Sequence, residues 1–216
     1  MYNKGKSVDM RQYLEYKNLK DRIIYKLINT EKYTELLEDL PHMEFLDLSI
    51  VFHCLISQKE MESETLLVHN IHLKLWDVTV EELFKAAKEN TPKLLPYELK
   101  SMAEVICGDN PEEELDAEDA ENAPMYVLSN KNRVGGAACM LYTNLIRDIA
   151  ELLGSSFYII PSSVHEVLIL PSADTSENEE IKVMIREIND TQMQSEEILS
   201  YSLYRYDKEE GRLYIC

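Results

Sequence analysis

A run of acidic residues divides the chain and limits how it can fold. Residues 109–121 hold eight carboxylates and no basic side chain, with almost no apolar residue between them. A segment of this composition has too little apolar surface to pack into a core. We therefore predict an N-terminal α+β lobe over residues 1–107, an acidic linker or disordered loop over 108–122, and a C-terminal ββα-type lobe over 123–216. One domain carrying a long loop is the alternative.

The rest of the composition is that of a folded protein with an acidic surface. Hydrophobic residues make up 45% of the chain and charged residues 29%, which is the balance of a globular protein. Of the net charge of −18, the acidic run holds eight charges, which leaves −10 on the rest. Such a surface repels phosphate backbones and anionic lipids, so we predict neither a nucleic-acid partner nor a membrane partner.

The sequence also predicts the cellular localisation of the protein. Its apolar runs are interrupted within about 10 residues, short of the roughly 20 that a membrane-spanning helix needs. Residues 1–6 are polar, unlike the apolar stretch of a secretory signal. We interpret the cysteines as reduced thiols, too widely spaced for a metal or redox pair, and predict a cytoplasmic protein without a cofactor. These thiols are Cys54, Cys107, Cys139 and Cys216.

Alternating apolar residues predict strands in the N-terminal half. The clearest alternation covers residues 45–55, and shorter apolar runs predict strands over 23–28 and 65–68. Residues two apart on a strand share a face. The predicted apolar face of the first strand consists of Leu46, Leu48, Ile50, Phe52 and Cys54.

Helical spacing predicts two helices in the same half. The first begins with Thr30 as its cap, and the residues it would bury are Tyr33, Leu36, Leu37 and Leu40. The second begins at a capping box formed by Thr79 and Glu82. We predict that this helix ends at Asn90-Thr91-Pro92, because proline interrupts helical hydrogen bonding.

The C-terminal half uses one order of elements twice: strand, strand, helix. Its apolar runs predict two such units and a closing hairpin, with strands over 125–129, 137–142, 157–160, 164–170, 203–206 and 213–215, and helices from Thr143 to Gly154 and after Ser176. The predicted fold class is α+β, with a mixed, mainly antiparallel sheet and helices packed on it.

The segment Pro161-Ser162-Ser163-Val164-His165-Glu166 has the residue types of a serine hydrolase. A Ser–His pair can form an activated nucleophile that a carboxylate orients. On a strand, however, His165 and Glu166 point to opposite faces, so Glu166 cannot orient His165. No glycine-flanked turn presents Ser162 or Ser163 either. The alternative role is a turn whose serines bind backbone groups.

His69 and His72 have the spacing of one helix face and could bind a metal ion together with Asp77 or Glu64. No third histidine or cysteine lies nearby in the sequence, and the HExxH motif is missing. We therefore predict no metal site. The alternative is that one histidine caps the helix or packs against Trp76 while the other lies at the surface.

Tyrosines are abundant, with 13 in the chain, and several lie near the C-terminus. An exposed tyrosine offers a large contact area with a polar tip, which suits a protein-binding face. Tyr201, Tyr204 and Tyr206, together with Trp76, are the candidate binding residues. The alternative is ordinary packing of these rings on the last hairpin.

The chain resembles a family of bacterial proteins from gut Firmicutes, the domain of unknown function 5688 family. The resemblance extends from about residue 22 to residue 207, and the segments that carry it are 40–52, 69–76, 81–92, 125–131, 135–142 and 161–167. The pattern is more distantly similar to the domain of unknown function 1444 family. The resemblance implies a bacterial, cytosolic, single-module protein and transfers no catalytic residue.

These features favour a non-enzymatic protein-interaction or regulatory module. The sequence contains no complete catalytic constellation, while its tyrosine-rich and acidic segments suit contacts with another protein. The alternative is a hydrolase with an unfamiliar site that uses Ser163 and His165 near a turn predicted at Gly135-Gly136. A third hypothesis is that the acidic run mimics DNA or binds a basic partner. The sequence sets no oligomeric state.

Overall fold

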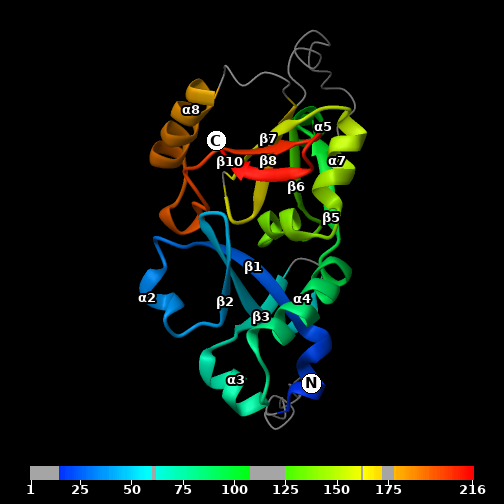
Figure 1. Cartoon of the computed structure of the whole chain (residues 1–216), viewed down its shortest axis with the longest axis vertical. Coiled ribbons are helices and arrows are strands. Elements are labelled where there is room, and N and C mark those ends of the chain that lie inside the picture. The colour runs from blue at the N-terminus through cyan, green and yellow to red at the C-terminus, as the bar shows by residue number, and fades with distance from the viewer. Residues whose placement is uncertain (1–14, 60–61, 108–124, 162, 172–177) are drawn as a thin grey trace, which may run out of the picture.

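Two antiparallel sheets form the framework of the protein (Figure 1). The computed structural model of the chain describes residues 15–59, 62–107, 125–161, 163–171 and 178–216. The smaller sheet, blue to cyan in Figure 1, comes from the N-terminal part of the chain, and the larger sheet lies beside it. Every strand pair in these ranges is antiparallel, and helices pack on both sheets. The predicted α+β class is therefore confirmed. The predicted acidic linker lies outside the described residues.

The smaller sheet is built around its longest strand. Strand β3 (Leu48–Lys59) pairs with β1 (Ile23–Asn29), β2 (His42–Phe45) and β4 (Glu62–Leu67). The predicted strands over 23–28 and 65–68 are confirmed. As the alternation predicted, Leu48, Ile50, Phe52 and Cys54 form a buried face of β3. The other face is buried too at Ser49, Val51 and Leu55, which the alternation did not indicate.

The predicted continuity of residues 45–55 is wrong at one point. Phe45 pairs with Leu48, so Leu46 and Asp47 form a two-residue turn between β2 and β3. Leu46 has a φ of 56° and is 38% exposed. A two-residue hairpin turn needs a residue with positive φ, usually glycine, asparagine or aspartate. Because leucine occupies this position, the turn has no signature in the sequence.

Four helical segments accompany the smaller sheet: α1 (Tyr16–Leu19), α2 (Thr34–Leu37), α3 (Asn70–Trp76) and α4 (Val80–Leu94), with a 3-10 turn η2 (Lys20–Arg22) after α1. The predicted first helix begins four residues later than Thr30. It ends at Leu37, which is buried, and Leu36 is exposed; Leu40 is also buried but lies after the helix.

Helix α4 has the predicted start and a different end. Thr79 Oγ1 accepts a hydrogen bond from the Glu82 backbone N–H, and the Glu82 carboxylate accepts one from the Thr79 backbone N–H, as predicted. The predicted end at Asn90-Thr91-Pro92 is wrong, since the helix continues to Leu94. Pro92 lies in the last turn, where the missing N–H breaks only one helical hydrogen bond.

The larger sheet has the strand order β10-β9-β7-β8-β6-β5. Its strands are β5 (Tyr97–Ser101), β6 (Tyr126–Asn130), β7 (Phe157–Ile160), β8 (Glu166–Pro171), β9 (Tyr204–Asp207) and β10 (Arg212–Ile215). The predicted closing hairpin is confirmed. Strand β5 and the short helix α5 (Met102–Cys107) precede the acidic run, so this sheet takes a strand from each side of it.

Two helices cover opposite faces of the larger sheet. Helix α7 (Leu145–Leu153) packs on the face that contains Phe157 and Ile159. Helix α8 (Asn178–Gln192) packs on the other face, against Tyr158 and Ile160. This alternation along β7 matches the period of a strand that is buried on both sides. The order β7, β8, α8 is the predicted strand–strand–helix unit.

The predicted strand over residues 137–142 is wrong. The segment is a 3-10 helix, η3 (Gly136–Leu141), which begins after Gly135 with a φ of 65°. Residues 136–140 are all buried. A short apolar run that is buried on every side does not show whether it is a strand or a helix, because neither period is visible.

One apolar cluster joins the two sheets. It includes Tyr25 of β1 and Tyr142, which follows η3, with ring centroids 6.4 Å apart. The Tyr142 hydroxyl donates a hydrogen bond of 2.5 Å to the Leu95 carbonyl, just after α4. Within the described ranges, no helix has the length and apolar character to span a membrane.

Candidate functional site

The segment with hydrolase-like residues forms a turn before β8. Ser163 is 7% exposed, and its Oγ accepts hydrogen bonds from the backbone N–H groups of His165 (2.9 Å) and Glu166 (3.3 Å). Glu166 lies 3.7 Å from the Arg133 guanidinium. Ser162 lies outside the described residues. The structure therefore gives Ser163 contacts with backbone groups and places the Glu166 carboxylate against an arginine.

His165 contacts the glycine turn that the hydrolase hypothesis placed near it. Its Nδ1 accepts a hydrogen bond of 3.3 Å from the Gly135 backbone N–H, and its carbonyl accepts one of 2.7 Å from Ser129 Oγ. A ring nitrogen that accepts a hydrogen bond carries no proton. In the neutral ring the proton is therefore on Nε2.

The two histidines at the start of α3 have protein partners. His69 Nδ1 lies 2.7 Å from the Asp39 carboxylate. His72 Nδ1 accepts a hydrogen bond of 2.8 Å from the His69 backbone N–H, and its ring stacks on Trp76 at 5.2 Å. Burial lowers the pKa of His72 below its usual value, and His69 acts in the same direction. No group of three potential metal ligands occurs among the described residues.

The candidate aromatic residues differ in exposure. Tyr204 and Tyr206 are 0% and 6% exposed, and Tyr206 stacks on Phe157 at 5.5 Å. Trp76 is buried under His72. Tyr201, in contrast, is 44% exposed, and its hydroxyl donates a hydrogen bond of 2.9 Å to Asp190 of α8. Tyr201 is therefore the ring of this set that another molecule can reach.

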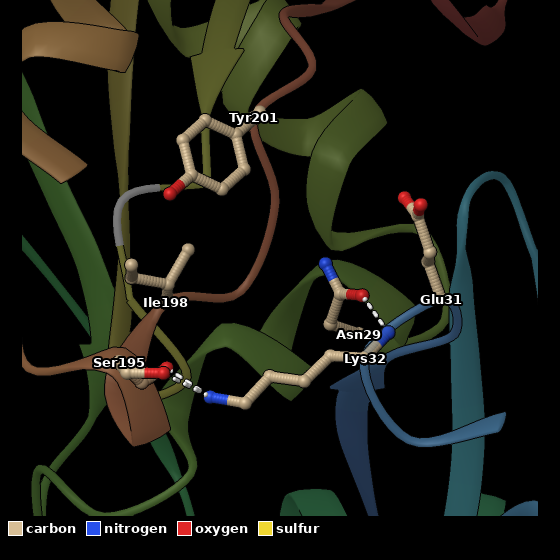
Figure 2. Close-up of a pocket in the computed structure, with 6 residues that line it drawn as sticks. All are labelled: Asn29, Glu31, Lys32, Ser195, Ile198 and Tyr201. Atoms are coloured by element: carbon tan, nitrogen blue, oxygen red, sulfur yellow. Dashed lines mark hydrogen bonds between the residues drawn. The ribbon is translucent and has the colours of Figure 1, made fainter. Parts of the chain in front are cut away.

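Tyr201 borders a pocket between the end of β1 and the segment that follows α8 (Figure 2). The pocket has a volume of about 340 Å³. Its lining consists of Asn29, Glu31, Lys32, Ser195, Ile198 and Tyr201. Ser195 belongs to the 3-10 turn η4 (Ser195–Glu197). Residues more than 160 positions apart in the sequence thus meet here.

Hydrogen bonds fix the floor of this pocket. Asn29 Nδ2 donates to the Leu199 carbonyl at 3.0 Å, while its Oδ1 accepts from the Lys32 backbone N–H at 2.8 Å. The Lys32 ammonium extends across the pocket and donates to Ser195 Oγ at 2.9 Å and to the Ser195 carbonyl (Figure 2). The two walls are therefore connected before any ligand binds.

A carboxylate anchors the segment that carries Tyr201. Asp47, in the β2–β3 turn, accepts hydrogen bonds from the hydroxyls of Ser200 (2.5 Å), Ser202 (2.9 Å) and Tyr204 (2.5 Å). Burial, and then the hydrogen bond to Asp47, raise the pKa of Tyr204. From the other side, Asn189 of α8 donates to the Ser200 carbonyl at 3.0 Å. These bonds hold Ser200 and Ser202, the residues on either side of Tyr201.

The pocket has the chemistry of a binding site. It offers an ammonium at Lys32, a carboxylate at Glu31, a hydroxyl at Ser195 and apolar surface on Ile198 and Tyr201. A concave site with mixed apolar and polar lining is typical of ligand recognition. Of these residues the sequence had indicated only Tyr201. The others carry no local signal, because β1 and η4 meet only in the folded chain.

A second polar cluster lies on the smaller sheet, apart from the pocket. The Lys26 ammonium donates to Thr65 Oγ1 at 3.5 Å, and Thr65 Oγ1 lies 3.2 Å from His53 Nδ1. Burial lowers the pKa of Lys26, and burial with the nearby Lys26 charge lowers the pKa of His53 to about 3. In the neutral form of His53, Nδ1 can accept a hydrogen bond from the Thr65 hydroxyl.

Comparison with known proteins gave one match. The model of a family of unknown function, DUF5688, matches residues 2–208 of this chain. The curated proteins gave no match, and neither did the solved structures.

Proposed function

We propose that this protein is a non-enzymatic protein-interaction module, and that its pocket at Tyr201 binds a short segment of another protein. The chain belongs to the family of unknown function DUF5688. The exposed, positioned ring of Tyr201 is the observation that carries this proposal. Tyrosine supplies contact area at a low cost in conformational entropy, which is why binding surfaces are rich in it.

The shape and preorganisation of the pocket support a bound segment. Its volume of about 340 Å³ lies at the lower end of ligand-pocket sizes, enough for one or two side chains of a peptide. Because Asp47 and Asn189 hold the Tyr201 segment in place, binding does not have to order it. Glu31 and Lys32 can orient the peptide by its charges.

We also infer that the partner is a protein in the cytoplasm. The net charge of −18 disfavours nucleic acid and anionic lipid. Cys54 and Cys139 are free, buried thiols, as in proteins of a reducing compartment.

Hydrolysis at Ser163 and His165 is the less favoured function. A serine hydrolase needs His Nε2 free of a proton, so that it can accept one from the serine, and Nδ1–H directed at a carboxylate. In this chain Nδ1 of His165 accepts from Gly135, so the neutral ring has its proton at Nε2. Ser163 is buried, and its oxygen binds two backbone groups.

Selection from a random peptide display library, followed by titration of selected peptides, tests the proposal. We expect Tyr201→Ala to weaken the Kd at least about 30-fold, which corresponds to the 2 kcal/mol of an interface hot spot. Tyr97→Ala is the matched control, because Tyr97 is 48% exposed on β5. Equal affinity of the two variants contradicts the proposed site. Turnover of an ester substrate that His165→Ala abolishes, without a loss of thermal stability, favours the hydrolase instead.

A further inference from the structure

Tyr201 also borders a second, smaller pocket on the α8 side of the larger sheet. This pocket has a volume of about 190 Å³, and its lining consists of Lys182, Arg186, Tyr201, Ser202, Leu203, Ile215 and Cys216. Pockets that enclose a whole small molecule usually measure about 300–1,000 Å³. The second pocket therefore fits a chemical group rather than a complete ligand.

The second pocket is basic in a strongly acidic protein. Lys182 and Arg186 lie one turn apart on α8, and no acidic side chain belongs to the pocket lining. Glu179 pairs with Lys182 at 2.8 Å, and Asp190 accepts from Tyr201. Within the described parts of the chain, Arg186 makes no ion pair within 4.0 Å. The arginine charge is thus available to a ligand.

A buried guanidinium lies next to this pocket. Arg205 of β9 is 5% exposed and stacks over the Tyr158 ring at 5.0 Å, on the sheet face that α8 covers. Arg205 follows the lining residues Ser202 and Leu203 in the chain, and Leu203 packs in the same apolar cluster as Tyr158. Burial raises the pKa of the Cys216 thiol, whereas Arg205 and Lys182 act in the opposite direction. Among the described residues, Nη1 of Arg205 has no hydrogen-bond partner. A buried, unpaired N–H group of a cation is costly unless an acceptor satisfies it.

We propose that this basic pocket binds an oxyanion, either a phosphate or a carboxylate, carried by the segment that occupies the Tyr201 pocket. The identity of the segment rests on the proposed function, whereas the anion site rests on its own residues. Guanidinium groups bind oxyanions through paired, charge-assisted hydrogen bonds, which are strongest where water is excluded. Arg186 provides the exposed guanidinium in the lining, and Arg205 adds a buried positive charge on the same face of the sheet. Tyr201, which both pockets share, connects the two sites.

Titration of the full chain with inorganic phosphate, and separately with acetate, tests the anion site. Backbone amide NMR shifts are followed at constant ionic strength. We expect saturable shifts at Lys182, Arg186, Ser202 and Ile215. Arg186→Gln should weaken the Kd by about tenfold or more, the share of one charge-assisted hydrogen bond. The tighter of the two anions identifies the group: phosphate favours a phosphorylated partner and acetate an acidic one.

Arg147→Gln on α7 is the matched control, because Arg147 is an exposed arginine beside Asp148. This substitution removes the same positive charge as Arg186→Gln. Shifts that do not saturate, or that Arg186→Gln and Arg147→Gln reduce equally, overturn the anion site. Phosphate binding with no peptide bound at Tyr201 supports the anion site and contradicts the proposed function. Peptide binding that depends on Tyr201 but not on Arg186, without NMR shifts on addition of either anion, supports the proposed function and overturns the anion site.

Discussion

Gly136 occupies a position that admits no side chain. A Cβ atom there would lie 2.2 Å from Ser129 Oγ, 2.3 Å from the His165 carbonyl oxygen and 2.7 Å from the Asn130 nitrogen. Two of these three atoms belong to the backbone, so the neighbours cannot rotate away. The close approach lets η3 pack directly on β6 and on the turn at His165.

Gly136→Ala should therefore lower the free energy of unfolding by about 3 kcal/mol or more, the upper range for overpacking. Urea unfolding measures the loss. Gly154→Ala is the control, because Gly154 has a φ of 73° with open space around the missing Cβ. That change should cost only the roughly 1–2 kcal/mol of a left-handed backbone. Equal losses in the two variants would show that the neighbours of Gly136 can accommodate a Cβ atom, which contradicts the prediction.

His53 gives the stability of the protein a distinct dependence on pH. Its pKa is about 3 in the folded state, against an ordinary value of 6.5. Protons therefore bind the unfolded chain more tightly, and the stability present above pH 6.5 is lost progressively as the pH falls towards 3. Between pH 7 and pH 5 the loss from His53 should be roughly 2 kcal/mol.

His53→Asn isolates this contribution from that of the carboxylates. The asparagine amide can stand in for Nδ1 as a partner of Thr65, but it does not titrate. We expect the wild type to lose roughly 2 kcal/mol more than the variant between pH 7 and pH 5 in urea unfolding. Parallel pH profiles for the two proteins would mean that His53 is accessible to protons in the folded state.

The candidate site shows how far single residues could be predicted. Period two predicted that Glu166 and His165 point to opposite faces of a strand, but β8 begins at Glu166, so His165 lies before it. The Glu166 carboxylate lies near Arg133. Tyr201 was one of several aromatic candidates, because exposure depends on which strand packs on which face. Lys32 and Ser195 had no signal in the sequence. Their contact is fixed only when β1 and η4 come together.

At the scale of elements, a buried hydroxyl of α4 bonds to the backbone of β1, the edge strand of the smaller sheet. Thr91 is completely buried, and its Oγ1 accepts a hydrogen bond of 3.1 Å from the Tyr25 backbone N–H of β1. The same hydroxyl donates to the Ala87 carbonyl at 2.7 Å. Asn90 adds hydrogen bonds to the Lys20 and Ile23 carbonyls. The helix thus satisfies an edge strand that would otherwise have unpaired groups.

Thr91→Val keeps the shape of the side chain and removes the hydroxyl, which leaves the Tyr25 N–H unpaired. We expect a loss of about 1–3 kcal/mol in the free energy of unfolding. Thr191→Val is the control, since Thr191 is exposed on α8 and its hydroxyl donates the same type of hydrogen bond to the Glu187 carbonyl at 2.6 Å. That control should change stability by less than about 0.5 kcal/mol. A similar small effect at both positions would rule out the hydroxyl as the link between α4 and β1.

Local patterns predicted elements well where one face met the core. The alternation from Leu48 to Cys54 is one example, because it reflects the period of a strand that packs on the core. The capping box at Thr79 is another, because its hydrogen bonds join residues only three apart. Prediction failed where the chain is buried on all sides, as in η3, or where backbone geometry overrides side-chain preference, as at Leu46. Pro92 within α4 shows the same limit, because tertiary contacts hold the last turn.

At the scale of the whole molecule, the order of strands in the larger sheet depends on long-range pairing, which local sequence patterns do not predict. Strand β5 pairs with β6 across the acidic run, and β7 lies between β8 and β9, an order that no local pattern contains. The apolar cluster also extends through both sheets. The contacts of Asp47 with three hydroxyls join the β2–β3 turn of the smaller sheet to the start of β9 in the larger sheet and to the residues before it.

Asp47 should therefore couple the unfolding of the two sheets. Asp47→Ala leaves the buried Tyr204 hydroxyl without its partner and should lower the free energy of unfolding by about 2–4 kcal/mol. Asp190→Ala is the control, because Asp190 also accepts a tyrosine hydroxyl but is exposed, and it should cost less than about 1 kcal/mol.

Hydrogen exchange of β3 and β7 amides measures the two sheets separately. Because one core spans them, the slowest amides of both strands should report the same opening free energy in the wild type. Asp47→Ala should lower both values by the same amount. If β7 alone loses protection, the sheets unfold independently, and the Tyr201 pocket between them loses its rigid support. A shared loss means that the pocket is as stable as the whole protein, since its two walls separate only on global unfolding.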